Sequence, residues 1–123
     1  MPKLFGLHEV VLPPGMTAEE YEQLFGKELA PLPDLPGWKT YLLKGDRGDG
    51  AGKLLLMFEI ESVEARDRYF PRPGPGGESE EFRQFQEQHP DATAASEKYT
   101  GFLVEPHSWT DFIVVGAPYT ENG

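Results

Sequence analysis

Residues 53–71 constrain the fold more than any other part of this chain. They join the most apolar run in the sequence, residues 53–61, to a short charged and aromatic segment, residues 66–71. Ser62 separates the two, and serine favours a helix start because its hydroxyl accepts a hydrogen bond from a backbone amide of the first turn. Proline ends a helix, so the sequence predicts a buried strand that runs directly into a short helix stopping at Pro71.

The predicted strand has two different faces. Because alternate side chains of a strand point in opposite directions, residues 54, 56, 58 and 60 form one wholly apolar set that should face the helices. The opposite set contains Met57 and becomes rich in carboxylates at Glu59 and Glu61. This pattern is typical of a face that meets solvent or a polar cavity, so we expect function on the side of Met57 and Glu59.

Three other strands are predicted from apolar and β-branched runs bounded by proline or glycine, at residues 3–12, 38–44 and 109–117. A helix follows the first strand, where Thr17 and Glu20 have the spacing of a capping box. A glycine-rich loop, residues 45–52, turns the second strand back into the third. A further helix is expected after Ser79, with an interruption at Pro90.

The order strand, helix, strand, strand, helices, strand predicts an α+β fold of the ferredoxin-like β-α-β-β-α-β type. Its four-stranded antiparallel sheet would hold the first and third strands in the centre. Helices would cover only one face, and leaving the apolar side chains of the other face in water costs about 25 cal/mol per Å². A second copy of the sheet is the simplest cover, so we expect a homodimer.

Residues 1–123 are predicted to form one domain, with residues 118–123 as a loose tail.

Several local patterns of the chain together resemble the dimeric α/β-barrel superfamily, which includes antibiotic-biosynthesis-type monooxygenases, EthD-like proteins and NIPSNAP-like proteins. The resemblance covers most of the chain and rests on the first strand with its proline-glycine turn (residues 7–15), the helix that follows, Pro36-Gly37-Trp38, and the junction at residues 59–62. It implies a dimeric α/β barrel with a pocket in the barrel or between sheet and helices. Members include cofactor-independent oxygenases, haem-degrading enzymes, isomerases and proteins of unknown role.

Composition excludes several classes of partner. Eleven basic against twenty-one acidic residues give a net charge of −10, which repels nucleic-acid phosphates and anionic membrane surfaces. The chain has no cysteine, no apolar run long enough to span a bilayer and no signal-peptide pattern at its start. We expect an acidic, cytoplasmic protein that binds neither nucleic acid nor membranes.

His8 and Glu59 lie on the two strands predicted to be central, at roughly the same level. If they share a face, Glu59 could orient the His8 imidazole for proton abstraction from an acidic phenol or enol. Glu9 could replace either partner. The alternative is a cavity-facing His8 that forms a hydrogen bond across the dimer and has no catalytic role.

Aromatic and charged side chains suggest ligand-binding positions. An aromatic pocket could hold a flat ligand. Met57 and Glu9 are further candidates for ligand contact, because they lie on the strand faces where we expect function. The aromatic candidates are Trp38, Tyr41, Tyr69 and Trp109. Arg66 could bind a ligand carboxylate in bidentate fashion. The alternatives are plain core or interface packing for the aromatic residues and, for Arg66, surface ion pairing with the adjacent Glu64 and Asp67.

No metal or cofactor is expected. The three histidines, His8, His89 and His107, have none of the short spacings of metal ligands. Residues 45–52 lack the lysine and the helix start of a phosphate-binding loop. Haem degradation in the resembled superfamily depends on a pocket asparagine, whereas the one asparagine here is Asn122 in the predicted tail.

The function predicted from the sequence is small-molecule binding. One hypothesis is a cofactor-independent monooxygenase or isomerase that acts on a small aromatic or enolisable compound, with His8 as base and Glu59 as its orienting partner. The alternative is a non-catalytic homodimer that serves as a binding or structural module. The sequence leaves open whether the protein is an enzyme.

Overall fold

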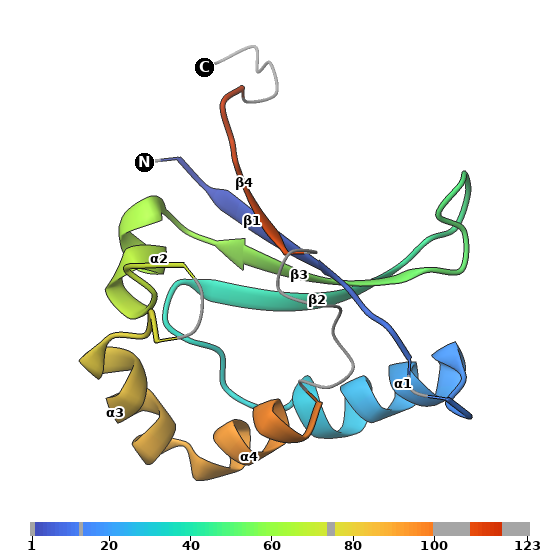
Figure 1. The fold of residues 1–123 in the computed structure, drawn as a ribbon, viewed down its shortest axis with the longest axis horizontal. Helices are drawn as coiled ribbons and strands as arrows, with labels where there is room; N and C mark the ends of the chain where they lie inside the picture. Colours follow the sequence, from blue (N-terminus) through green and yellow to red (C-terminus); the bar gives the residue numbers. More distant parts are fainter. Residues whose placement is uncertain (1, 13, 74–75, 100–108, 117–123) are drawn as a thin grey trace.

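The computed structural model describes residues 2–12, 14–73, 76–99 and 109–116 of the chain. Its strands form one antiparallel sheet in the order β2-β3-β1-β4 (Figure 1). The strands are β1 (Leu4–Glu9), β2 (Trp38–Lys44), β3 (Leu54–Ile60) and β4 (Thr110–Ile113). The prediction that the first and third strands lie side by side in the centre is therefore confirmed.

The helices begin where the side chains supply caps. The Thr17 hydroxyl accepts a hydrogen bond from the Glu20 amide at 3.1 Å and the Glu20 carboxylate accepts one from the Thr17 amide at 3.2 Å, as predicted for a capping box. Ser62 and Ser79 accept bonds from amides of the next two helices. The helices are α1 (Ala18–Leu24), the π-helix η1 (Phe25–Leu29), α2 (Val63–Tyr69), α3 (Glu80–Gln88) and α4 (Pro90–Tyr99).

Helices lie on one side of the sheet. Figure 1 shows α1, α3 and α4 along this side and no helix of the described chain along the other. We call the first side the helix face and the second the open face. None of these helices is both long and apolar enough for a bilayer crossing, as far as the described residues go.

Strand register assigns each side chain to one of these faces. In β1 and β3, His8 is opposite Leu56 and Phe5 is opposite Glu59. His8, Leu56 and their alternate neighbours belong to the helix face, and the predicted apolar set of β3 faces the helices as expected. The open face is formed by the other set: Phe5, Leu7, Glu9, Lys39, Tyr41, Leu43, Leu55, Met57, Glu59, Thr110 and Phe112.

The buried core lies at both ends of the helix face. A cluster of Val10, Tyr21, Leu54 and Leu56 packs one end of the sheet against α1. Leu4 and Ile60, which are only 2% and 1% exposed, pair across β1 and β3 at the other end. The sheet between these ends faces a cavity.

Two predicted strands were too long. The first ends at Glu9, although the Val10 amide still donates to the Leu54 carbonyl at 3.0 Å. The last is only Thr110–Ile113, because its pairing partner is the four-residue segment 4–7 of β1. The predicted tail, residues 118–123, lies outside the described residues, as does His107.

Candidate functional site

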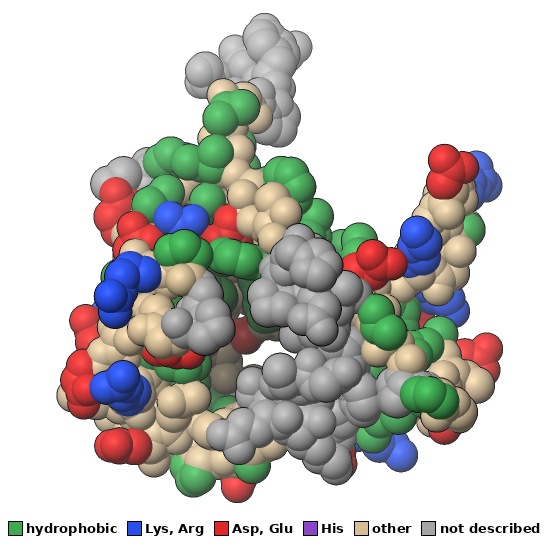
Figure 2. Space-filling model, in the orientation of Figure 1, with side chains coloured by type: hydrophobic (Ala, Val, Ile, Leu, Met, Phe, Trp, Pro, Cys, Tyr) green, Lys and Arg blue, Asp and Glu red, His purple; other side chains and the backbone are tan. Residues whose placement is uncertain are grey.

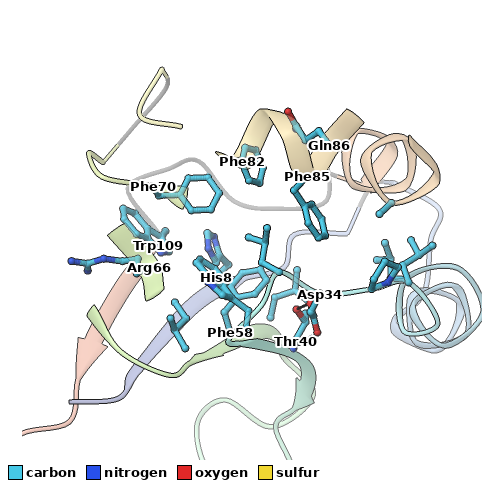
Figure 3. Close-up of a pocket in the computed structure, with 18 of the residues that line it drawn as sticks. His8, Asp34, Thr40, Phe58, Arg66, Phe70, Phe82, Phe85, Gln86 and Trp109 are labelled. Atoms are coloured by element: carbon cyan, nitrogen blue, oxygen red, sulfur yellow. Dashed lines mark hydrogen bonds between the residues drawn. The ribbon is translucent and has the colours of Figure 1, made fainter. Parts of the chain in front are cut away.

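A cavity of about 700 Å³ lies between the helix face of the sheet and the helices (Figures 2 and 3). Figure 2 shows the molecule hollowed between these two layers. Pockets of this size hold drug-sized small molecules and are usually apolar with a few polar groups. The apolar part of the wall is formed mainly by Phe25, Leu29, Trp38, Leu56, Phe58, Ile60, Phe70, Phe82 and Phe85.

Aromatic rings connect the sheet to α3 along this wall. The Trp38 ring lies 6.0 Å from the Phe58 ring and 5.6 Å from the Phe70 ring, measured between centroids. Phe70 in turn lies 4.6 Å from Phe82. Tilted and edge-on rings at these separations attract each other, so the wall is built to present aromatic surface.

A polar cluster at one end of the cavity is centred on Asp111 of β4. Its carboxylate accepts hydrogen bonds from the Trp109 indole at 3.0 Å and from Arg66 Nη1 at 3.1 Å. The side chain of Asp111 is only 11% exposed. Gly6 is its register partner on β1, and a Cβ atom at residue 6 would come within 2.8 Å of Asp111 Oδ1. Glycine at position 6 therefore leaves the space that the carboxylate occupies.

The charge of Arg66 is balanced inside the protein. Burial opposes this charge, but hydrogen bonds to Asp67 at 3.0 Å and to Asp111 raise the pKa of the guanidinium above its ordinary value. Arg66, a predicted contact for a ligand carboxylate, lines the cavity, yet it is already paired with two carboxylates. It is not a free receptor for a ligand carboxylate.

His8 lies on the floor of the cavity between two aromatic rings. Its ring is edge-on to Phe58 at 5.5 Å and stacked on Trp109 at 6.1 Å. Burial lowers the pKa of His8 below its ordinary value of about 6.5, and the charge of Asp111 offsets only part of this effect. The imidazole is therefore neutral near pH 7 and keeps one nitrogen as a hydrogen-bond acceptor.

The lowered pKa of His8 makes protein stability depend on pH. As pH falls below about 6.5, the unfolded chain takes up a proton at His8 that the folded protein resists. The stability contributed by neutral His8 is present above that pH and is lost as pH falls toward the lowered folded pKa. We expect urea denaturation between about pH 7 and pH 5 to give a smaller loss of unfolding free energy in His8→Phe than in wild type. Equal losses would contradict this assignment.

Two further polar features lie around Trp38 and β2. The Thr40 hydroxyl and amide donate to the two oxygens of Asp34 at 2.7 and 3.2 Å. In Figure 3, Asp34 and Thr40 lie to the right of His8 and Phe58, whereas Arg66 and Trp109 lie to their left. The Trp38 indole Nε1 is buried and has no hydrogen-bond partner within the described part of the chain. An unpaired buried donor is unfavourable, so this atom is a candidate contact for a ligand acceptor.

The structure separates the predicted catalytic pair. Glu59 pairs with Phe5, and His8 pairs with Leu56. Phe5 is three residues from His8 along β1, and residues an odd number apart in a strand face opposite ways. His8 therefore belongs to the helix face and Glu59 to the open face. Glu59 instead accepts hydrogen bonds from Lys3 at 2.8 Å and Tyr41 at 3.1 Å. These bonds hold the pKa of Glu59 below its ordinary value. The prediction that Glu59 could orient His8 is therefore wrong.

The other predicted ligand-binding residues are divided between the two faces. Trp38 and Trp109 line the cavity together with His8. The rest of the predicted set includes Glu9, Tyr41 and Met57, which lie on the open face. Tyr69 is 4% exposed within α2 and is not among the residues that line the cavity.

Sequence reasoning missed Asp111 and the phenylalanines of the wall. The spacing of Trp109 and Asp111 was an available signal, because residues two apart in a strand share a face. Phe70, Phe82 and Phe85 gave no comparable signal, since their approach to the sheet depends on how α2 and α3 pack.

Comparison of this chain with known proteins supports the fold. No protein-family model matches the chain, and no curated protein was found to be similar. An uncharacterised NIPSNAP-like domain protein from Burkholderia xenovorans superposes with a TM-score of 0.56 at 16% identity, over 96% of this chain and 88% of that one. The fold is ferredoxin-like. A dimeric ferredoxin-like protein of unknown function from Thermobifida fusca YX superposes less well, with a TM-score of 0.43 at 16% identity, over 92% and 90% of the two chains.

This ferredoxin-like chain thus has two distinct surfaces that could bind a partner. The helix face encloses the cavity, whereas the open face presents apolar side chains at the surface, including Phe112 at 52% exposure. Within the described residues there is no group of three or more histidine, aspartate or glutamate side chains that could hold a metal ion. In the described cavity, neutral His8 could accept a hydrogen bond or a proton from a ligand.

Proposed function

We propose that this protein binds a small aromatic compound in the cavity between its sheet and its helices. The observation that carries the proposal is the aromatic wall of a cavity of about 700 Å³ with the neutral imidazole of His8 at its floor. Rings of the wall would stack on a flat ligand, and the free acceptor nitrogen of His8 would take a hydrogen bond from a ligand hydroxyl.

The same geometry supports a catalytic hypothesis. A neutral imidazole near the carboxylate of Asp111 could accept a proton from a bound phenol or enol, and the negative charge of Asp111 would stabilise the imidazolium that forms. This proton transfer is the first step required of either a cofactor-independent monooxygenase or an isomerase. A non-catalytic binding module would share the cavity but would leave the bound compound unchanged, so product analysis after incubation separates the two hypotheses.

A substitution that fills the cavity tests the proposed binding site. Ala92 of α4 lines the cavity, whereas Ala94 of the same helix is exposed and does not. We expect calorimetric titration with 2-naphthol to show binding to wild type and to Ala94→Trp. Ala92→Trp should weaken binding at least about tenfold, which corresponds to about 1.4 kcal/mol, because the indole occupies ligand space. Equal affinity in the Ala92 and Ala94 variants would place the ligand elsewhere.

A second copy of the chain is the proposed partner of the open face. This face carries Phe5, Leu7, Leu55 and Met57 on the two central strands, with Tyr41 on β2. Tyr41 and Phe112 are 38% and 52% exposed, which leaves apolar surface in water. Two copies related by a two-fold axis would bury this surface against itself. The resulting homodimer would leave the cavity of each chain on the outer side of its sheet.

A further inference from the structure

We propose that the cavity selects uncharged ligands: it binds the neutral form of a flat aromatic compound that carries a hydroxyl donor and a carbonyl acceptor, and it rejects the corresponding anions and cations. In this arrangement His8 accepts from the hydroxyl and the Trp38 indole donates to the carbonyl. The inference rests on the proposed function and narrows its ligand class.

The charges around the cavity argue against an anionic ligand. Three carboxylates, Asp34, Asp67 and Asp111, line it against two guanidiniums, Arg66 and Arg72. Arg66 is held by two of these carboxylates. Arg72 is solvent-exposed, where a single ion pair contributes little. An anion that entered the aromatic part of the cavity would therefore lose its hydration, and no described residue would offer it a free buried cation.

A cationic ligand meets a similar obstacle. Asp67 and Asp111 are both occupied by Arg66, so neither is a free counter-charge. Asp34 accepts two hydrogen bonds from Thr40 and is itself exposed, so water screens its remaining charge. Desolvation of an ammonium group beside the aromatic wall would be poorly compensated.

Two residues that line the cavity, His8 and Trp38, have neutral hydrogen-bonding groups with unused capacity. The ring of His8 is neutral, and in the described part of the chain its nitrogens make no hydrogen bond. The Trp38 indole nitrogen is a buried donor without a partner among the residues that the structure describes, and Trp38 itself lines the cavity. A ligand hydroxyl would supply the donor that His8 lacks and a ligand carbonyl the acceptor that Trp38 lacks, and buried sites discriminate strongly for such matched groups.

Naphthalene derivatives of similar shape separate the effect of ligand charge on affinity from the effect of ligand shape. We would titrate the protein near neutral pH with naphthalene, 2-naphthol, 2-naphthoate, 2-naphthylmethylammonium and 6-acetyl-2-naphthol by calorimetry. The expected result is that 2-naphthol binds at least about tenfold more tightly than either ion, with 6-acetyl-2-naphthol several-fold tighter still. In Trp38→Phe, the acetyl group should no longer increase the binding affinity. In His8→Phe, 2-naphthol should bind no more tightly than naphthalene.

The outcomes distinguish this inference from the proposed function on which it rests. If 2-naphthoate or the ammonium probe binds as tightly as 2-naphthol, charge selection is overturned while the aromatic site stands. If 6-acetyl-2-naphthol still binds Trp38→Phe more tightly than 2-naphthol by the wild-type factor, the indole does not donate to the carbonyl. If no probe of the series binds to wild type, the proposed function itself fails. Circular dichroism of each variant establishes that a loss of binding is not a loss of folding.

Discussion

Gly6→Ala should destabilise the protein, whereas Gly26→Ala should stabilise it. Alanine at residue 6 would place its methyl carbon 2.8 Å from Asp111 Oδ1, too close for any contact without a shift. The carboxylate cannot yield cheaply, because its side chain is only 11% exposed and it accepts hydrogen bonds from both Trp109 and Arg66. Displacing it leaves buried polar groups unpaired, and we expect a loss of about 1–3 kcal/mol in unfolding free energy.

Gly26 is the matched control for this substitution. It lies in the helical segment η1, it is exposed, and an added methyl group would meet nothing within 4 Å. Alanine lowers the entropy of the unfolded chain and should add about 0.5–1 kcal/mol. Urea denaturation at one protein concentration measures both changes. A Gly6→Ala protein as stable as wild type would mean that Asp111 is not held in the described position.

Met57→Lys should convert a dimer into a monomer. Met57 lies at the centre of the open face, opposite Leu7 on β1 and Tyr41 on β2. If a second sheet packs there, an ammonium group at this position must lose its hydration against apolar side chains. We expect the dimer dissociation constant to rise about 100-fold or more, equivalent to about 2.7 kcal/mol. Analytical ultracentrifugation over a dilution series measures the change directly.

The control for this variant adds the same charge away from the open face. Gln84 is an exposed residue of α3, so Gln84→Lys should leave the dimer intact. Met57→Lys should still bind 2-naphthol, because residue 57 and the cavity lie on opposite sides of the sheet. Wild-type protein that sediments as a monomer throughout the series would refute the proposed homodimer.

Local features of the chain could be predicted well from the sequence. Thr17 with Glu20, and Ser62 alone, carry the chemistry of a helix start within three or four residues, and both predicted caps are present. The alternation in residues 54–60 likewise predicted which side chains face the helices, since strand parity is a local property. These features required no knowledge of distant parts of the chain.

Contacts between distant segments were harder to predict from the sequence. Whether His8 and Glu59 share a face depends on the register between β1 and β3, and a shift of one residue reverses the answer. Arg66 and Asp111 are 45 positions apart and meet only because α2 packs near the edge strand. The sequence pattern favours a site beside Met57 and Glu59, whereas the described cavity lies on the other side of the same strand.

The location of a bound aromatic ligand tests the central claim most directly. Adjacent residues of β3 report on the two faces: Leu56 and Ile60 line the cavity, while Leu55 and Met57 belong to the open face. Intermolecular nuclear Overhauser effects should be recorded between 2-naphthol and methyl-labelled protein. We expect contacts with the methyl groups of Leu56 and Ile60 and none with those of Leu55 and Met57. Contacts with Leu55 and Met57 instead would contradict a binding site between the sheet and the helices.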